Sequence, residues 1–391
     1  MDFTFTDEQK LLRETVQKFV EKELKPLAAK IDRNHEVPRS LLTQMGELGF
    51  YGVSVPPEYG GAGMGELGHC LVGEEVARGC ASTSVVMGAH VSLAITAILL
   101  DGTEAQKQKY LPSMVQGQWF GAFALTEPGA GSDASAIETR AVRDGDSYLL
   151  TGTKLFITNG SFADVLIVFA VTDKALGARG GVTAFLVEKG MPGFKVGKID
   201  DKMGIRGSPT TELIFEEVRV PQEHVLGQVG YGFATAMKTL DRGRLSLAAG
   251  CLGGCKELLD VSAKYAIQRT QFGKPIAEHE AIQWMLAEME REVFLCESIV
   301  YRTAWMADQE MRFSHESAIA KLHVSEALNR CADMAVQLHG GYGYIAEFPV
   351  ERMYRDARIH RIFEGTNEIQ RIIIARDVLK SHGYDLKLKV G

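Results

Sequence analysis

One acidic residue stands where a carboxylate could act as a general base. Glu364 lies within Ile362–Glu368, between apolar residues and a glycine and just before the N-cap of a predicted helix. Apolar surroundings disfavour the charged form of a carboxyl group, so they raise its pKa toward the pH at which a general base works. Because most loop glutamates are simply solvated, this pattern alone makes Glu364 a candidate and leaves a surface role open.

A glycine-rich turn follows a predicted strand at Thr126–Ser132. Gly129–Ala134 fits the loose G-x-G-x-x-A pattern of dinucleotide sites, but the flanking sequence lacks the βαβ unit that such a site requires. The turn can still present backbone N–H groups and hydroxyls to a phosphate or a ring. An ordinary turn explains these residues equally well.

Three further segments combine residue types that suit a flat, phosphorylated ligand. Phe156 and Thr158 are two residues apart in a predicted strand, so we expect them on one face, where they could pack against and hydrogen-bond a heterocycle. The glycines of Gln337–Tyr344 allow close approach of a ligand or of another backbone. Arg269–Lys274 offers a guanidinium fork for phosphate and an aromatic ring. A core strand, a helix C-cap and a basic loop are the structural alternatives.

The composition excludes several classes of function. The chain has 391 residues, 46% hydrophobic and 24% charged, as expected of a globular protein with two or three domains. Its net charge of −7 provides no basic surface for nucleic acid or anionic lipid. The six cysteines lack metal-ligand spacing, and Cys251 and Cys255 are assigned to helix packing. We expect no nucleic-acid partner, no membrane association and no metal.

The sequence also predicts a cytoplasmic protein. Met1–Thr4 opens the chain without the basic and apolar regions of a targeting peptide. The most apolar stretch, Val85–Leu100, contains His90 and is shorter than the ~18 residues of a membrane span. We therefore expect it to be a buried helix.

Hydrophobic periodicity divides the chain into three regions. Residues 1–117 are predicted to be helical, with a first helix that begins at a capping box and stops at Pro26, and a long helix at 83–115. Residues 118–229 hold short β-branched runs without crossover helices, which favours an antiparallel sheet. Residues 230–391 return to the helical period and can pair as a bundle. The predicted strands are 121–125, 148–150, 155–158, 165–172, 182–187, 194–199 and 212–220, and the predicted long C-terminal helices are 230–268, 278–310 and 315–340.

Five segments carry a family resemblance in their order and spacing. They are Leu125–Asp133, Ile157–Gly160, Arg269–Pro275, Gln337–Tyr344 and Phe363–Arg371. Together they resemble the acyl-CoA dehydrogenase family, and most of all its bacterial short-chain (butyryl-CoA) members. The resemblance implies an acyl-CoA dehydrogenase-like fold with an N-terminal α-helical domain, a middle antiparallel β domain and a C-terminal four-helix-bundle domain.

The resemblance implies a non-covalent FAD between the β domain and the C-terminal helices. In the family, residues matching the glycine-rich turn and the Phe156 strand hold the flavin and the pyrophosphate, with Thr158 at the reactive N5 edge. Residues matching Arg269, Phe272 and Gln337–Gly341 reach the FAD of a neighbouring subunit, which implies a homotetramer built as a pair of dimers. The cofactor-binding residues so implied are Phe123, Leu125, Thr126, Gly131, Ser132, Phe156, Ile157, Thr158, Arg269, Phe272, Gln337, Leu338, Gly340, Gly341, Thr366, Asn367 and Glu368.

The resemblance also implies oxidation of an acyl-CoA thioester. Glu364 matches the base that removes the α-proton while the β-hydrogen leaves as hydride to flavin N5, which gives the trans-2-enoyl-CoA. The family binds the thioester carbonyl through the backbone N–H at the Glu364 position and a ribityl hydroxyl of FAD, and it passes electrons to an electron-transfer flavoprotein. The substrate-binding residues so implied are Ser132, Asp241, Arg244 and Gly365.

Two positions depart from common family patterns. Many members carry Trp where this chain has Phe156, a change that should preserve packing against the flavin. Some branched- and long-chain members place their base at the position of Gly243. Because glycine cannot act as a base, Glu364 is the only candidate base among the two positions at which the family places one.

The acyl chain is not fixed by these residues. His90–Ala94 are expected to approach the floor of the acyl pocket, and the leading expectation is a short or short-branched acyl-CoA. A longer, cyclic or dicarboxylic acyl-CoA stays open. So do an acyl-CoA oxidase, disfavoured because such relatives are usually much longer than 391 residues, and a catalytically silent scaffold that binds flavin or CoA.

Overall fold

The N-terminal region is a layer of helices that starts at the predicted capping box. The computed structural model describes residues 4–386, and in it the Thr6 hydroxyl accepts a hydrogen bond from the Gln9 N–H at 3.2 Å. Helix α1 (Asp7–Phe19) does not end the helical path before Pro26. A π-helical turn and a 3₁₀ turn carry the chain on into α2 (Ala28–Asn34), because proline is tolerated in the first turn of a helix, where its missing N–H has no partner to lose.

The predicted helix at 83–115 is divided in the structure. α5 (Ala81–Gly88) passes through a π-helical segment into α6 (Thr96–Asp101), and the chain then breaks at Gly102. The run from Ala81 to Asp101 has 21 residues, so it is long and apolar enough to cross a membrane, and the length argument against a span does not hold. Of its 18-residue apolar window, 67% is nevertheless buried inside the protein, as a buried helix should be. The remaining helices of this layer are α3 (Arg39–Glu47), α4 (Gly65–Gly79) and α7 (Glu104–Val115).

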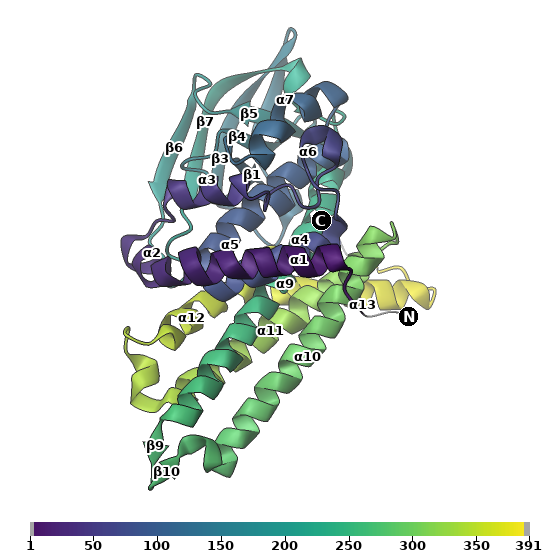
Figure 1. Cartoon of the computed structure of the whole chain (residues 1–391). Helices are drawn as coiled ribbons and strands as arrows, with labels where there is room; N and C mark the ends of the chain where they lie inside the picture. The colour runs from purple at the N-terminus through teal and green to yellow at the C-terminus, as the bar shows by residue number, and fades with distance from the viewer. Residues whose placement is uncertain (1–3, 387–391) are drawn as a thin grey trace.

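The middle region is one curled sheet. Its strands follow the order β6-β7-β3-β2-β4-β5-β8, and β1 pairs with β4 (Figure 1). Most pairs are antiparallel as predicted, but β1 runs parallel to β4, and β2 meets β4 in one parallel pair. The two predicted strands at 148–150 and 155–158 are one long strand, β3. The strands are β1 (Gly121–Ala124), β2 (Arg140–Asp144), β3 (Ser147–Thr158), β4 (Val165–Val171), β5 (Val182–Glu188), β6 (Phe194–Ile199), β7 (Thr210–Pro221) and β8 (Val225–Leu226), with the short helix α8 (Ala178–Gly181) before β5.

Strand β4 is buried on both faces and joins two cores. Val165, Ile167 and Phe169 belong to the core shared with the N-terminal helices. Leu166 and Val168 belong to a second core that is made almost entirely of strand residues. Since successive side chains of a strand point to opposite faces, this alternation places the helical layer on one side of the sheet and the interior of the curled sheet on the other.

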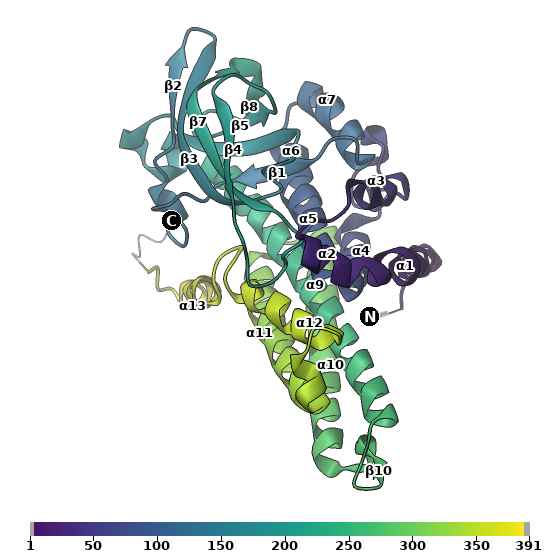
Figure 2. The same ribbon diagram turned by 90° about the vertical axis from the view of Figure 1, so that its left-hand side faces the viewer.

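The C-terminal region is a bundle of long helices that extends away from the sheet (Figures 1 and 2). The buried cysteines Cys251, Cys255, Cys296 and Cys331 lie in its core, which supports the packing role assigned to the first two. Its far end carries the β9–β10 hairpin (Figure 1). The elements are α9 (Gly232–Gln268), β9 (Thr270–Gln271), β10 (Lys274–Pro275), α10 (Glu280–Asp308), α11 (Ser314–His339), α12 (Pro349–Ala357) and α13 (Asn367–Ser381).

A buried carboxylate fixes the helical layer to the bundle. Glu74 of α4 is fully buried and accepts hydrogen bonds from Arg13 of α1, Lys256 of α9 and Tyr301 of α10, at 2.9, 2.6 and 2.6 Å. Four helices from both ends of the chain therefore meet at one charge. Helix α9 also packs its first residue, Gly232, against β5, so it connects the bundle with the sheet.

Candidate active site

The loop before α13 holds Glu364 in a left-handed backbone conformation that residues other than glycine rarely adopt. Glu364 has φ +54° and Gly365 has φ +85°. Thr366 is the N-cap of α13, and its hydroxyl accepts a hydrogen bond from the Ile369 N–H at 3.3 Å, which confirms the predicted cap. Strained φ values persist only where the surroundings impose them, and they gather at functional sites.

Two side chains hold the carbonyls of this loop in place. Arg244 Nε donates to the Glu364 carbonyl at 3.3 Å, and Gln370 Nε2 donates to the Gly365 carbonyl at 3.0 Å. Arg244 is buried and forms an ion pair with Asp241 at 2.9 Å. The structure therefore brings three of the four predicted substrate-binding residues, Asp241, Arg244 and Gly365, together around Glu364.

The Glu364 side chain is half-buried, and its buried Oε2 atom is a free acceptor. Its Oε2 atom has no hydrogen-bond partner within residues 4–386. Burial raises the pKa of the carboxyl group to about 7, against the opposing charges of Arg244 and Lys321. A carboxyl group with a pKa near neutrality and an unused lone pair has the properties of a general base.

The observed position of the Glu364 carboxylate requires a glycine at position 243. A Cβ atom built on Gly243 would lie 2.5 Å from Glu364 Oε2 and 2.7 Å from Leu93 Cδ2. Leu93 belongs to the π-helical segment Ala89–Ile95, so one residue of the segment expected at the pocket floor lies near Glu364. His90 of the same segment is fully buried and hydrogen-bonds Gly121 and Met114.

Strands β1 and β3 bring the glycine-rich turn beside Phe156–Thr158. The turn is followed by only a short 3₁₀ turn at 134–136, so it has no βαβ context, as expected. The pairing of β3 with β7 shifts between Lys154 and Ile157, and Phe156 has φ +59°. This irregularity interrupts the regular alternation assumed for the strand. Ile157 is still buried between an exposed Phe156 and a half-buried Thr158.

A buried ion pair under the turn was not predicted from the sequence. Lys154 is fully buried, and its Nζ donates to Glu127 Oε1 at 2.7 Å and to the Leu125 carbonyl at 3.1 Å. Glu127 also accepts from the N–H groups of Glu138 and Thr139, at 2.6 and 3.0 Å. Burial would raise the pKa of Glu127, but Lys154 and these N–H groups outweigh it and hold the pKa low. The pair therefore fixes the start of the turn to β3.

Replacing Lys154 with methionine should destabilise the protein by about 3–5 kcal/mol, because it leaves the Glu127 charge buried without a counter-charge. The free energy of unfolding in denaturant measures the effect. Lys195→Met is the matched control, since its ion pair with Glu216 is on the surface and both side chains are 59% exposed. The control should lose less than about 1 kcal/mol. Equal losses in the two variants would contradict the structural role of Lys154.

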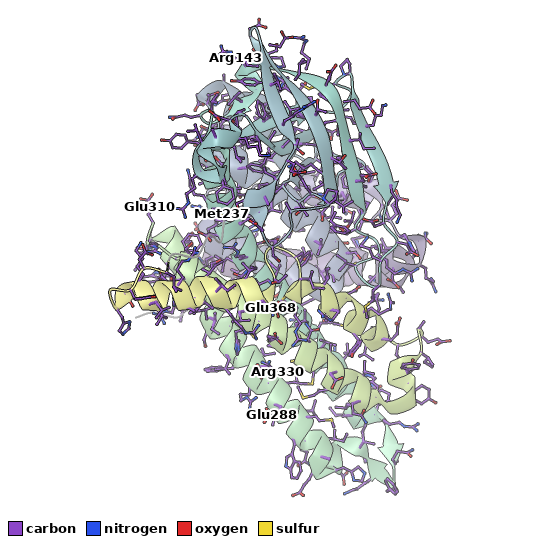
Figure 3. The ribbon with its side chains drawn as sticks, turned by 180° about the vertical axis from the view of Figure 1, so that it is seen from behind. Arg143, Met237, Glu288, Glu310, Arg330 and Glu368 are labelled. Carbon is purple, nitrogen blue, oxygen red and sulfur yellow. The ribbon has the colours of Figure 1, made fainter. Side chains whose placement is uncertain are left out.

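The remaining predicted cofactor residues lie elsewhere in the chain. Arg269, Phe272, Leu338, Gly340 and Gly341 line one groove at the far end of the bundle, beside the β9–β10 hairpin and far from the sheet (Figures 1 and 2). Gln337 is exposed on the last turn of α11 next to them. One chain therefore does not bring this group to the glycine-rich turn. Glu368 is exposed at the start of α13, where the bundle meets the rest of the molecule (Figure 3).

Several features fit a large flat ligand with phosphates. Phe156 is 61% exposed and Phe272 is 94% exposed. Cβ atoms built on Gly129, Gly131, Gly340 and Gly341 would meet no atom within 4 Å in the described chain. Exposed aromatic rings and open glycine backbone suit ring stacking and phosphate binding. Among residues 4–386, no three His, Cys, Asp or Glu side chains gather as a metal site would require.

Comparisons with known proteins agree with this arrangement. Family models described as acyl-CoA dehydrogenase N-terminal, middle and C-terminal domains match residues 6–118, 122–218 and 230–379. The chain is 43% identical over 380 residues to a short-chain specific acyl-CoA dehydrogenase of Clostridium acetobutylicum, covering 97% of this chain and 100% of the relative.

Two solved structures are similar over almost the whole chain. Butyryl-CoA dehydrogenase from Megasphaera elsdenii superposes with a TM-score of 0.95 at 42% identity, covering 97% of this chain and 100% of the other. A chain solved in work on the electron transferring flavoprotein of Acidaminococcus fermentans and flavin-based electron bifurcation has a TM-score of 0.96 at 45% identity, with the same coverage.

Proposed function

The chain belongs to the acyl-CoA dehydrogenase family, and from this premise we propose that it converts a short or short-branched acyl-CoA to the trans-2-enoyl-CoA, with Glu364 as the base. It is an oxidoreductase, and FAD is its cofactor. One observation carries the assignment of the base. Glu364 combines a raised pKa with a buried, unpaired Oε2 atom and a glycine at position 243, where a side chain would displace the carboxylate.

The residues of this chain supply proton transfer and positioning. Glu364 Oε2 takes the α-proton, which the thioester carbonyl acidifies. The Glu364 N–H is assigned to the thioester carbonyl, whose negative charge grows as the proton leaves. Arg244 and Gln370 hold the loop carbonyls and so fix the carboxylate. FAD, when bound, provides the acceptor for the β-hydrogen.

The cofactor is assigned to two sets of residues. Phe123–Ser132 and Phe156–Thr158 would hold it from the sheet side, and Thr366–Glu368 from the start of α13. The groove with Arg269 and Phe272 is assigned to the cofactor of a second copy, because it lies far from the sheet of its own chain. This assignment predicts a homotetramer made of two such dimers, with one FAD per chain.

The electron acceptor is assigned to an electron-transfer flavoprotein. The likeness to a chain from the Acidaminococcus fermentans flavoprotein work supports this partner. Electron transfer to oxygen is the alternative, and it predicts one peroxide per acyl-CoA oxidised at a rate that competes with dye reduction. We expect only slow peroxide formation.

The short acyl chain is supported by likeness to the short-chain and butyryl-CoA relatives. A series from butyryl-CoA to hexadecanoyl-CoA tests it through kcat/KM with an artificial electron acceptor. We expect kcat/KM to be highest at the short end. A maximum at the long end, or with a cyclic or dicarboxylic acyl-CoA, would replace this substrate class and leave the reaction type in place.

The reaction should depend on the ionisation of the base. Glu364 must be deprotonated to accept a proton, and its pKa is about 7. The kcat/KM value, which reports the free enzyme, should therefore fall as the pH drops below about 7. A profile that stays flat down to the ordinary pKa of a glutamate would show that the base is not this buried group.

A further inference from the structure

A buried lysine lies behind the loop of the base. Lys321 of α11 is fully buried, and its Nζ donates to Asn367 Oδ1 at 2.7 Å. No carboxylate of residues 4–386 lies within ion-pair distance of it. Burial lowers the pKa of Lys321 to about 8, against the opposing charge of the Glu364 carboxylate, so Lys321 is an ammonium at neutral pH.

An ammonium buried without a counter-charge is strongly unfavourable. The carboxylates whose charges act on Lys321 are those of Glu364 and Glu368. Glu368 is exposed, and solvent screens it. Glu364 has a buried oxygen without a hydrogen bond, so its charge also lacks a direct partner. Each of the two groups is therefore the remaining opposite charge that acts on the other.

Few other charged groups near Glu364 could balance its carboxylate charge. Helix α9 contributes Arg244, which is already paired with Asp241, and the buried thiol of Cys251. Helix α11 contributes Lys321 and also Glu326, which is already paired with Arg361. The exposed Glu368 lies at the first turn of α13 and acts on Lys321. Lys321 is thus the cation near the base that has no carboxylate of its own.

Lys321 also fixes the start of α13. Asn367 is 1% exposed, and it receives Lys321 on Oδ1 while its Nδ2 donates to Ser325 Oγ and Glu326 Oε1, each at 3.0 Å. Asn367 follows Glu364 by three residues. A residue held this firmly limits the movement of the strained loop.

We propose that Lys321 is a positioning residue for Glu364, acting as the fixed counter-charge that keeps the base ionised and, through Asn367, as the clamp of the loop that carries it. This inference rests on the proposed role of Glu364. When the base accepts the α-proton its charge is lost while the ammonium remains, so Lys321 favours the state that is ready to react.

The pH profile of kcat/KM separates this role from a purely structural one. Lys321→Gln keeps an N–H donor for Asn367 and removes the charge. Without the ammonium the carboxyl group should protonate more readily, so the acid limb should move up by about one pH unit. Lys321→Arg, which keeps the charge, should leave the limb at the parental pH.

A matched control tests the clamp without the charge. Ser325→Ala removes one partner of Asn367 and keeps the ammonium. It should therefore lower the maximum kcat/KM without changing the pH at which kcat/KM falls on the acid side. Far-UV circular dichroism and the FAD content verify the fold of each variant, and Lys321→Met serves as a second neutral variant if the glutamine form does not fold.

The outcomes also distinguish this inference from the proposed function. A Lys321→Gln limb at the parental pH, with Glu364→Gln inactive, would overturn the counter-charge role alone. If Glu364→Gln kept the parental rate, the base assignment itself would fail, and the Lys321 role with it.

Discussion

Replacing Glu364 with glutamine is expected to slow reduction of the bound flavin by acyl-CoA by about 10³-fold or more, because an amide keeps the shape of the side chain and cannot accept a proton. The protein should stay yellow, since neither the glycine-rich turn nor the Phe156 strand is altered. Anaerobic rapid mixing with acyl-CoA, followed through the visible flavin absorbance, measures the rate.

Glu310→Gln is the matched control for this change. Glu310 also adopts a left-handed conformation, with φ +53°, but it is exposed in the turn that follows α10 (Figure 3). The same substitution there should leave the rate unchanged. A Glu364→Gln protein that reduces its flavin at the parental rate would remove Glu364 from the mechanism.

Replacing Gly243 with alanine should lower kcat/KM by about 10²-fold, because a displacement of about 1 Å at a reacting group has an effect of that size. The added methyl group would lie 2.5 Å from Glu364 Oε2 and 2.7 Å from Leu93, so the carboxylate must move. The helix itself should not suffer, since alanine is favoured over glycine in a helix interior by about 1 kcal/mol.

Gly250→Ala on the same helix provides the comparison. Its nearest neighbour would be the hydroxyl of Ser84 at 3.2 Å, the end of a small side chain that can rotate. This variant should keep its activity and its midpoint of thermal unfolding. A Gly243→Ala protein with parental kcat/KM would show that Glu364 is not confined as the structure indicates.

Much of the fold could be predicted because its signals are local. The capping box at Thr6 and the cap at Thr366 are short patterns, and the change from helical to strand periodicity separates the three regions. The parallel pairing of β1 with β4 is not local, because it joins segments about forty residues apart, and no turn chemistry indicates it. The break at Gly102 was hidden by the apolar run that precedes it.

The site was partly predictable for the same reason. The role of Glu364 as a candidate base is predicted by the residues on either side of it, and the cofactor residues are predicted by the family resemblance. Lys154 and Lys321 were missed because a lysine in sequence indicates a surface. They are buried by strands and helices that are distant in sequence and pack against them only in the folded protein. The bulge at Phe156 likewise depends on pairing with β7, which the sequence of β3 alone does not specify.

The most direct test of the central claim is the anaerobic visible spectrum of the purified protein before and after addition of butyryl-CoA. We expect a yellow protein whose flavin band bleaches when the thioester is added, because the cofactor takes up the hydrogen that leaves the substrate. A colourless protein that cannot be reconstituted with FAD, or a yellow one that no acyl-CoA bleaches, would contradict it.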